Sequence, residues 1–227
     1  MDGKYGMKPR RIIHPEEGDT MLLADIGNTH FHIYDGERVE HLPYSEAIGR
    51  YRKQPLKYIS VNTDIEKQIG CIGEWENISQ KIHLPGEYDT MGVDRKALCL
   101  SHENGIFVDA GTAITVDIME KGIYRGGFIF PGIQAMVKCY AGISPVLDIE
   151  VDPSVDPDRL PFTTKEQISY GIIASIKALI NQHRNRKTLY FTGGDGEFLS
   201  TFFEHADYSE TLVFEGMRYA LKEMREC

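Results

Sequence analysis

Two similar turns, each set between short apolar segments, constrain the fold of this chain more than any other feature of its sequence. In the first, residues 21–24 (MLLA) lead into residues 25–29 (DIGNT), and residues 30–34 (HFHIY) then alternate between polar and apolar side chains. In the second, an apolar run leads into residues 109–112 (DAGT), and the alternation resumes after them. Each pattern predicts a strand, a tight turn and a second strand. The Asp, Gly and small polar residues at matching offsets indicate an internal repeat.

The residue types in these turns suit a polyphosphate and its cations. A glycine lets the backbone approach phosphate groups, a hydroxyl such as that of Thr112 can donate a hydrogen bond, and a carboxylate such as that of Asp109 can hold a cation or a cation-bound water. The alternative is a plain hairpin turn, which uses the same residue types. One turn alone is compatible with both interpretations, so the rest of the chain decides between them.

Each turn opens a similar succession of predicted elements. After the first we expect a helix near residues 45–53, a strand over 56–61 and a helix over 64–75. After the second, we expect a strand over 122–130, a helix ending near 141, a loop over 144–162 and then a helix capped by Thr163 or Thr164. A strand over 189–191, a strand over 212–214 and a helix from Met217 follow. The apolar residues of the capped helix that we expect in the core are Ile168, Ile172, Ile173, Ile176 and Leu179. We therefore expect an α/β protein of two halves, residues 21–103 and 104–227, whose two Asp-containing turns lie across one cleft.

The composition is that of a folded globular protein and argues against several functional classes. With 227 residues, 41% of them hydrophobic and 26% charged, the chain can bury a sizeable core in one or two domains. The net charge of -9 argues against a general nucleic-acid binder. No apolar run approaches the roughly 20 residues that cross a bilayer. Residues 1–20 lack the apolar centre of a secretory signal and are expected to form a flexible arm, with Met21 as a second candidate for the translation start.

The cysteines and histidines are scattered, and no familiar nucleotide or metal motif is present. The cysteines show no CxxC or zinc spacing, which favours free thiols in a reducing compartment and predicts a cytoplasmic protein. They are Cys71, Cys99, Cys139 and Cys227. His30 and His32 alternate on a predicted strand without other ligands near them in the sequence, so we interpret them as exposed or hydrogen-bonded histidines. The chain also lacks a GxxxxGK(S/T) phosphate loop, a GxGxxG dinucleotide motif, an HExxH zinc motif and an EF-hand loop.

A polar segment between the halves carries candidate substrate-binding residues. Residues 86–91 (GEYDTM) form a predicted loop, and residues 92–95 (GVDR) begin a predicted helix. Asp94 lies in the first turn of that helix, where an acid interacts favourably with the helix dipole, so N-terminal capping is one interpretation. The other interpretation is that Asp94 accepts a proton from a substrate hydroxyl while Arg95 binds a carboxylate or phosphate.

Two glycine-rich segments in the second half are further candidates. Residues 126–132 (GGFIFPG) predict a strand that ends in a Pro-Gly turn, and residues 192–196 (TGGDG) follow a buried strand. Glycines in the first segment permit close backbone packing or the approach of a ligand. The second segment can let an adenine ring or a phosphate lie against the backbone, with a plain turn as the alternative.

Taken together and in this order, residues 25–29, 92–95, 109–113 and 126–132 resemble motifs of the type III pantothenate kinases. That family belongs to the actin-like superfamily of sugar and acetate kinases, actin and the large heat-shock chaperones. The resemblance extends from Met21 to the C-terminus and includes the spacing of the motifs. It implies two ribonuclease H-like halves with mixed sheets flanked by helices, an ATP cleft between them, and a homodimer. It also implies phosphorylation of pantothenate by ATP, the first step of coenzyme A synthesis, with Mg2+ and a monovalent cation, K+ or NH4+.

The resemblance further implies roles for residues of the first half. The first phosphate loop would comprise Asp25, Ile26, Gly27, Asn28, Thr29, His30, Phe31 and His32. Asp25 would lie near the divalent metal, while the identities of the two histidines often differ in the family. Pantothenate would be held by Gly92, Val93, Asp94 and Arg95, with Asp94 as the proton acceptor. Tyr88 is the candidate substrate tyrosine, although it lies closer to residues 92–95 than is usual in the family.

In the second half, the resemblance implies that Asp109 binds the monovalent cation and that Thr112 contacts ATP. Thr164 would contact substrate from the dimer interface, and residues 192–194 would lie on the adenosine side. Two alternatives remain. The first is a kinase or phosphatase of the same superfamily that acts on another substrate. The second is a non-catalytic regulator that senses ATP, and residues 92–95 argue against it because a sensor needs neither a base nor a substrate-binding arginine.

Overall fold

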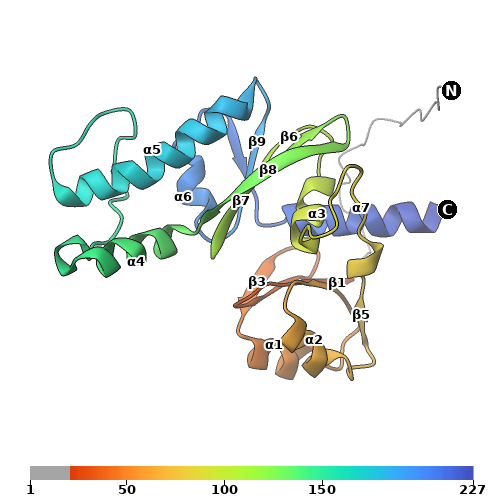
Figure 1. Cartoon of the computed structure of the whole chain (residues 1–227). Coiled ribbons are helices and arrows are strands. Elements are labelled where there is room, and N and C mark those ends of the chain that lie inside the picture. The colour runs from red at the N-terminus through yellow and green to blue at the C-terminus, as the bar shows by residue number, and fades with distance from the viewer. Residues whose placement is uncertain (1–20, 227) are drawn as a thin grey trace. The chain divides into compact units, whose positions relative to one another are not determined.

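The structure, a computed structural model, describes residues 21–226 and divides them into two compact units (Figure 1). The first unit comprises residues 21–103, 120–123 and 213–226, and the second comprises residues 104–119 and 124–212. The predicted N-terminal arm, residues 1–20, lies outside the described residues, as does Cys227. The sequence analysis assigned all of residues 104–227 to the second half, whereas the structure groups residues 213–226 with the first unit.

The first unit is built on a mixed five-stranded sheet. Its strands are β1 (Leu22–Ile26), β2 (Phe31–Tyr34), β3 (Val39–Leu42), β4 (Leu56–Ser60) and β5 (Trp75–Asn77), in the order β3-β2-β1-β4-β5. Its helical segments are α1 (Tyr44–Tyr51), α2 (Thr63–Ile69), η1 (Ser79–Lys81), α3 (Val93–Leu100) and α7 (Leu212–Glu226) after its first residue. Strand β1 runs antiparallel to β2 and parallel to β4, so the hairpin and the crossover meet at the central strand.

The second unit repeats this topology. Its strands are β6 (Gly105–Ala110), β7 (Ala113–Glu120), β8 (Ile123–Pro131), β9 (Leu189–Thr192) and β10 (Ala206–Tyr208), in the order β8-β7-β6-β9-β10. Its helical segments are α4 (Ile133–Ile143), η2 (Pro145–Leu147), α5 (Thr164–Arg184) and α6 (Gly196–Ser200). Strand β6 again runs antiparallel to the next strand and parallel to the one reached by a crossover. The predicted α/β class with two mixed sheets flanked by helices is confirmed.

The apolar pattern of each element accounts for its core. The hairpin strands of the first unit alternate, so Ile26, Phe31 and Ile33 are buried while His32 is half-exposed. On α5, Ile168, Ile172, Ile173 and Ile176 face the core as predicted. The prediction for Leu179 was wrong, because the helical stripe continues through Ile180, which is fully buried, and leaves Leu179 partly exposed.

Two predicted elements differ in type from the structure. Residues 212–214, predicted as a strand, form the first turn of α7, because Met217, Ala220 and Leu221 extend the same apolar stripe at helical spacing. A short apolar run does not distinguish a buried strand from a buried helical turn. The predicted helix over 64–75 ends at Ile69, and Trp75 instead opens β5.

Contacts of α7 explain why it belongs with the first unit. The ring of Phe214 stacks on Tyr34 of β2, with ring centroids 5.3 Å apart, and the guanidinium carbon of Arg218 lies 5.3 Å from the centroid of the same tyrosine ring. A Cβ on Gly216 would overlap the carbonyl of Ala97 in α3, so the two helices approach closely at this glycine. Helix α7 therefore packs on both the sheet and α3 of the first unit.

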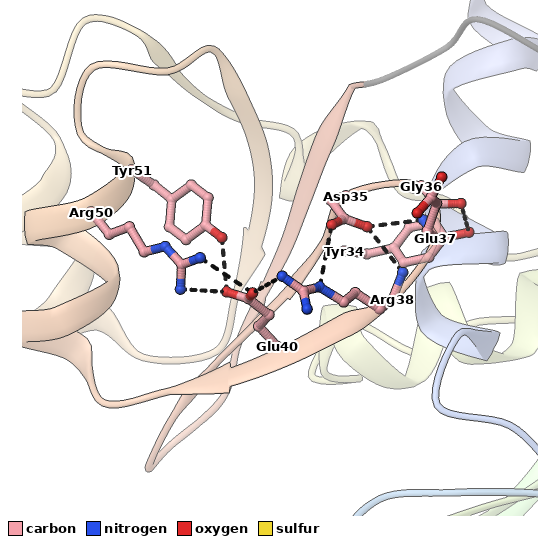
Figure 2. Close-up of polar contacts among 8 residues, drawn as sticks. All are labelled: Tyr34, Asp35, Gly36, Glu37, Arg38, Glu40, Arg50 and Tyr51. Atoms are coloured by element: carbon pink, nitrogen blue, oxygen red, sulfur yellow. Dashed lines mark hydrogen bonds and ion pairs between the residues drawn. The ribbon is translucent and has the colours of Figure 1, made fainter.

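A polar network fixes the β2–β3 hairpin, as Figure 2 shows. Asp35 accepts hydrogen bonds from the backbone N–H groups of Glu37 and Arg38, each at 2.9 Å, in the turn that joins the strands. Glu40 on β3 is bound by Arg38 at 2.8 Å, by Arg50 of α1 at 2.9 Å and by the hydroxyl of Tyr51 at 2.9 Å. Exposed ion pairs contribute little individually, but this network ties the edge strand β3 to a helix and so pins its register.

Candidate functional site

The first predicted phosphate loop forms the end of β1, a tight turn and the start of β2. Asp25 is half-buried and lies opposite His32 in the β1–β2 register. The backbone N–H of Gly27 donates to the carbonyl of His30 at 3.1 Å and closes the turn. Asn28, Thr29 and His30 are exposed. The structure therefore presents polar turn residues to solvent, with Asp25 at the base of the turn.

Two residues that the sequence analysis did not identify hold this turn in place. The hydroxyl of Tyr44 donates to the carbonyl of Gly27 at 2.9 Å, and the side-chain amide of Asn62 donates to the Tyr44 oxygen at 3.2 Å. Asn62 also caps α2, because its side-chain oxygen accepts from the N–H groups of Asp64 and Ile65. An Asn before a helix is a recognisable cap in a sequence, but its contact with a turn far away in the chain becomes visible only in the fold.

The segment of residues 92–95 lies at the start of α3. Gly92 is the N-cap, and the carboxylate of Asp94 accepts a hydrogen bond from the backbone N–H of Arg95 at 2.8 Å. A Cβ on Gly92 would overlap that carboxylate oxygen, so the position requires glycine for this arrangement. Satisfying a first-turn N–H is the structural role foreseen for Asp94, and it also fixes where the carboxylate lies.

Arg95 and Tyr88 form a contact within the same segment. Nη1 of Arg95 donates a hydrogen bond to the hydroxyl of Tyr88, with 2.7 Å between the nitrogen and the oxygen. The guanidinium carbon lies 5.9 Å from the centre of the tyrosine ring. Arg95 is only 6% exposed, whereas Tyr88 is 42% exposed. Because burying a charge is costly unless polar groups surround it, the arginine is held by its surroundings rather than extended into solvent. The structure brings these two predicted substrate residues together.

The first turn and the α3 start share one edge of the first sheet. Parallel strands β1 and β4 end side by side, and the N–H of Val61, just after β4, donates to the carbonyl of Ile26 at 3.2 Å. The Val61 side chain lies 3.9 Å from the position that a Cβ on Gly92 would occupy. Helix α3 also packs against β4. Two motifs that are more than sixty residues apart in the chain therefore lie within one neighbourhood of the first unit.

In the second unit, two other segments converge on the turn that follows Asp109. The N–H of Gly111 donates to the carbonyl of Ala113 at 3.0 Å and closes the turn. The N–H of Gly132, at the end of the predicted glycine-rich strand, donates to the carbonyl of Thr112 at 3.0 Å. The N–H of Asp195, in the segment of residues 192–196, donates to the carbonyl of Ala110 at 2.9 Å.

Glycines make this convergence possible. Gly193 has a φ of 84°, and a Cβ there would lie 2.5 Å from the Asp109 carboxylate and 2.6 Å from the carbonyl oxygen of Ala110. A Cβ on Gly132 would overlap the carbonyl oxygen of Gly111 and would lie 2.6 Å from that of Thr112. From the sequence, close backbone packing or the approach of a ligand was expected for residues 126–132, and a ligand against the backbone or a plain turn for residues 192–196. The structure shows that both segments approach the Asp109 turn closely.

The convergence places oxygen atoms of the Asp109 turn beside the two glycines. The Asp109 carboxylate and the Ala110 carbonyl lie next to Gly193, and the carbonyls of Gly111 and Thr112 lie next to Gly132. Carboxylate and carbonyl oxygens are the ligands that hard cations prefer, and a ring of carbonyls can replace the water shell of K+. Across residues 21–226, no cluster of three or more His, Cys, Asp or Glu side chains is placed to hold a metal ion. The donor set of this turn fits a weakly bound hard cation rather than a transition metal.

Asp195 is an additional acid at this place, and the sequence analysis did not assign it a role. Its backbone binds the turn, and its side chain is partly buried. Burial raises the pKa of the Asp195 carboxyl above its ordinary value, because desolvation disfavours the charged form. Asp195 is therefore a partly buried carboxyl on the segment that binds the Asp109 turn.

Thr164 lies elsewhere in the second unit. Thr163, not Thr164, caps α5, and it forms a capping box with Glu166. Thr164 is exposed at the first position of the helix. Figure 1 shows α4 and α5 extending from the sheet of this unit, with the connecting loop and the start of α5 at the far end. Within its own unit, Thr164 is therefore not brought to the Asp109 turn. A pocket of about 290 Å³ lies in the preceding loop, lined by Asp152, Ser154, Val155, Asp156, Arg159, Leu160, Pro161, Phe162 and Glu166.

The comparisons with known proteins agree on one family. The model of the type III pantothenate kinase family matches residues 54–186. A type III pantothenate kinase of Helicobacter hepaticus is 42% identical over 208 residues, which cover 89% of this chain and 98% of that protein. A type III pantothenate kinase of Wolinella succinogenes is 40% identical over 208 residues, which cover 91% of this chain and 99% of that protein.

Solved structures extend the likeness to the fold. A Campylobacter jejuni protein described as a conserved Baf family transcriptional activator superposes with a TM-score of 0.83 at 36% identity, covering 91% of this chain and all of that one. The activator of 2-hydroxyisocaproyl-CoA dehydratase from Clostridium difficile, solved with bound ADPNP, gives a TM-score of 0.52 at 11% identity, covering 91% of this chain and 97% of that one. The second likeness concerns the fold alone. No helix between residues 21 and 226 is long and apolar enough to span a membrane.

Proposed function

The chain belongs to the type III pantothenate kinase family, and we propose that the first turn, the Tyr88–Arg95 segment and the Asp109 turn together form the site that transfers phosphate from ATP to pantothenate. The reaction is the first step of coenzyme A synthesis. The observation that carries this proposal is the shared sheet edge of the first unit. There, Val61 is hydrogen-bonded to Ile26 and its side chain lies next to Gly92, so a phosphate-type turn lies near a carboxylate and a buried arginine.

Asp94 is the proton acceptor in this proposal. The attacking group is the primary hydroxyl of pantothenate, and the reaction needs that hydroxyl in line with the γ-phosphorus of ATP. The start of α3 fixes the Asp94 carboxylate through the Arg95 N–H, so a hydroxyl bound there meets an oriented acceptor. Arg95 binds the pantothenate carboxylate, and its contact with the hydroxyl of Tyr88 orients the guanidinium for that role.

Residues of both turns contact the nucleotide. Residues 25–32 contact the phosphates, with Asp25 holding the divalent ion through water or through the phosphates themselves. Thr112 contacts ATP from the second turn, and residues 192–194 form the adenosine side. When bound, Mg2+ neutralises charge on the phosphates and assists their orientation. Because the two turns belong to different units, the ATP cleft between them is part of the proposal.

Asp109 is the proposed site of the monovalent cation. Neither turn contains a lysine, so the phosphate charge must be balanced by other means. The Asp109 carboxylate and the carbonyls of residues 110–112 are oxygen ligands of the kind that K+ takes. No side chain fits at Gly193 or Gly132, because a Cβ there would overlap or crowd these oxygens.

A regulatory function is the second candidate, because the C. jejuni structure at 36% identity is described as a transcriptional activator. A sensor of ATP needs a nucleotide site but no base and no substrate-binding arginine. Release of ADP that depends on pantothenate, measured with and without K+, separates the two candidates. We expect release only when pantothenate is present. Release without it favours a sensor or another substrate.

The catalytic assignment is tested by replacing Asp94 with Asn. The amide keeps the size of the side chain and its oxygen can still accept from the Arg95 N–H, but it cannot take a proton. We expect kcat to fall about a hundredfold to ten-thousandfold, while both substrates still bind. Asp89→Asn is the matched control, because Asp89 is an exposed acid in the preceding loop. Steady-state kinetics and calorimetric binding of pantothenate measure the two effects.

A kcat for Asp94→Asn within a few-fold of the wild type would remove Asp94 as the base. An equal loss in Asp89→Asn would show that the assay responds to charge in general. Loss of pantothenate binding in Asp94→Asn would instead assign this carboxylate to substrate binding.

We also propose that the chain forms a homodimer through the connection between α4 and α5. Large apolar side chains gather there and are 72–88% exposed, namely Ile143, Val146, Leu160 and Phe162. Exposed apolar groups in one region mark an interaction surface. Thr164 follows two residues after Phe162, so a partner subunit seated on this surface would approach Thr164. This geometry supports a contact of Thr164 with substrate across the dimer.

Phe162→Asp tests the dimer. A charge at the most exposed of these side chains should convert the dimer to a monomer in sedimentation experiments at micromolar concentration, because the carboxylate would have to be desolvated in the interface. Met224→Asp is the control, since Met224 is an exposed apolar side chain on α7. An unchanged sedimentation coefficient for Phe162→Asp would place the interface elsewhere. We also propose a cytoplasmic location, which the free thiols of Cys71 and Cys139 support.

A further inference from the structure

Two histidines meet on the β2–β3 hairpin: His32, at the end of the proposed phosphate loop, and His41, which has no role in the proposed reaction. His32 lies opposite His41 in the register of β2 and β3, and Asp25 lies opposite His32 in the register of β1 and β2. Residues directly opposite each other in antiparallel strands share one face of the sheet. The three side chains therefore form a row across β1, β2 and β3. The network of Figure 2 fixes the same hairpin, because Glu40 beside His41 is bound by Arg38 and Arg50.

The Nδ1 atoms of the two rings face each other. The Nδ1 atoms of His32 and His41 are 2.6 Å apart, the ring centroids are 4.8 Å apart, and the ring planes make an angle of 74°. At this separation one Nδ1 donates and the other accepts, so a single proton lies between two nitrogen atoms that both can bind a metal. A metal ion bound by both would replace that proton. At metal–nitrogen distances of about 2.0–2.1 Å, the nitrogens would have to separate by about 0.3 Å for a ligand angle of about 90° and by about 0.7 Å for a tetrahedral angle.

From this geometry we infer that His32 and His41 form a binding site for a borderline divalent transition-metal ion of the nickel and zinc class. Imidazole nitrogen is a preferred ligand for these ions and a poor one for Mg2+. His41 is exposed and His32 half-exposed, so water can fill the remaining positions. Among residues 21–226 no group of three or more His, Cys, Asp or Glu side chains is placed to hold a metal ion, so the site fits reversible binding rather than a permanent structural metal.

Occupancy of this site has a consequence for the neighbouring turn. The Nε2 atom of His32 lies 3.9 Å from the position that a Cβ on Gly27 would occupy, so the ring that binds the metal also lies beside the first turn. A metal ion would hold the His32 ring in one orientation beside the residues that we propose to contact ATP. We therefore expect the bound ion to inhibit the kinase.

The test is titration of the tag-free full-length chain with NiCl2 by calorimetry, without ATP or pantothenate. Because no substrate is present, the result is independent of the proposed kinase function. The variants are His41→Ala, which removes one ligand, and His41→Gln, which can still accept or donate a hydrogen bond to His32. The control is His205→Asn, which removes an exposed imidazole, and Asn tolerates the positive φ of 53° at that position.

We expect the wild type and His205→Asn to bind Ni2+ equally. Both His41 variants should bind at least roughly tenfold more weakly, since loss of even an indirect partner costs metal sites about 10–100-fold in affinity. Ni2+ should raise the midpoint of thermal unfolding of the wild type and not that of His41→Gln. Wild-type affinity in either His41 variant, or an equal loss in His205→Asn, would overturn the site. If His41→Ala unfolds, His41→Gln decides alone.

Discussion

The two Asp-containing turns occupy the same place in the same topology, yet different groups pack against them. Each follows the central strand of a five-stranded sheet, β1 in the first unit and β6 in the second. In both sheets the hairpin strands lie on one side of the central strand and the strands reached by a crossover lie on the other. Asp25 faces the residue seven positions later and Asp109 the residue six positions later, so the first turn is one residue longer. The first turn is held by a side chain, the hydroxyl of Tyr44, whereas the second is held by the backbone N–H groups of Gly132 and Asp195.

Because different groups surround them, two turns of the same topology can bind different ligands. Around the first turn lie side chains that can donate hydrogen bonds, such as Thr29, His30 and Tyr44. Around the second lie backbone carbonyls and the Asp109 carboxylate, which are acceptors. Donors suit phosphate oxygens and acceptors suit cations. The sheet topology is shared, and the residues that pack on each turn assign the roles that we propose.

Adding a Cβ to each turn gives the strongest test of whether only the second turn depends on close backbone approach. In Gly193→Ala, the new atom would lie 2.5–2.6 Å from oxygens of Asp109 and Ala110, at a φ of 84°. We expect a loss of at least about 2 kcal/mol in the free energy of unfolding from crowding and backbone strain. In Gly27→Ala the nearest atom would be 3.7 Å away, an ordinary contact, so the loss should stay below about 1 kcal/mol.

Urea unfolding of both variants measures this pair. Equal midpoints for Gly193→Ala and Gly27→Ala would contradict the claim that only the second turn is built by close backbone approach. A large loss in Gly27→Ala alone would reverse the comparison.

A second pair of variants tests whether the monovalent cation binds at Asp109 and the divalent ion at Asp25. Asp109→Asn should weaken activation by K+ on the order of tenfold, because the variant loses the one charged ligand of the oxygen-rich turn. Asp25→Asn should instead raise the Mg2+ concentration needed for half-maximal activity. Initial rates over K+ and Mg2+ titrations measure both. An unchanged K+ response in Asp109→Asn, or a shifted K+ response in Asp25→Asn, would remove the assignment.

The smallest expected effect concerns Asp195, which has no counterpart that we identified at the first turn. Burial raises its pKa, so the folded state binds a proton more tightly than the unfolded state. The carboxyl therefore lowers the stability of the fold increasingly as the pH rises from its ordinary pKa of about 3.9 through the raised value. Asp195→Asn removes this cost and should stabilise the protein at neutral pH by less than about 1 kcal/mol.

Thermal unfolding at pH 4 and pH 7 measures the effect of Asp195→Asn. The gain should be present at pH 7 and should shrink at pH 4. A variant that is less stable than the wild type at pH 7 would show that the ionised carboxylate is stabilised by a partner in the fold.

Much of the site was predictable because it depends on local sequence. Glycine, acid and hydroxyl residues between alternating apolar segments predict a turn wherever they occur, and Thr163 with Glu166 predicts a capped helix. The prediction of a strand at residues 212–214 was wrong because an apolar run of three carries no period. Its environment, stacking of Phe214 on Tyr34, lies far away in the chain.

The sequence by itself determined the order of the elements, the two turns and the residue types at the start of α3, since periodicity and turn chemistry act over a few residues. Tertiary structure alone decided which groups meet. Sheet register brought His41 to His32, parallel strands brought the first turn to Gly92, and glycines at 132 and 193 let distant backbone reach Asp109. These contacts depend on packing between segments that are far apart in the chain, and the composition of any one segment does not encode them.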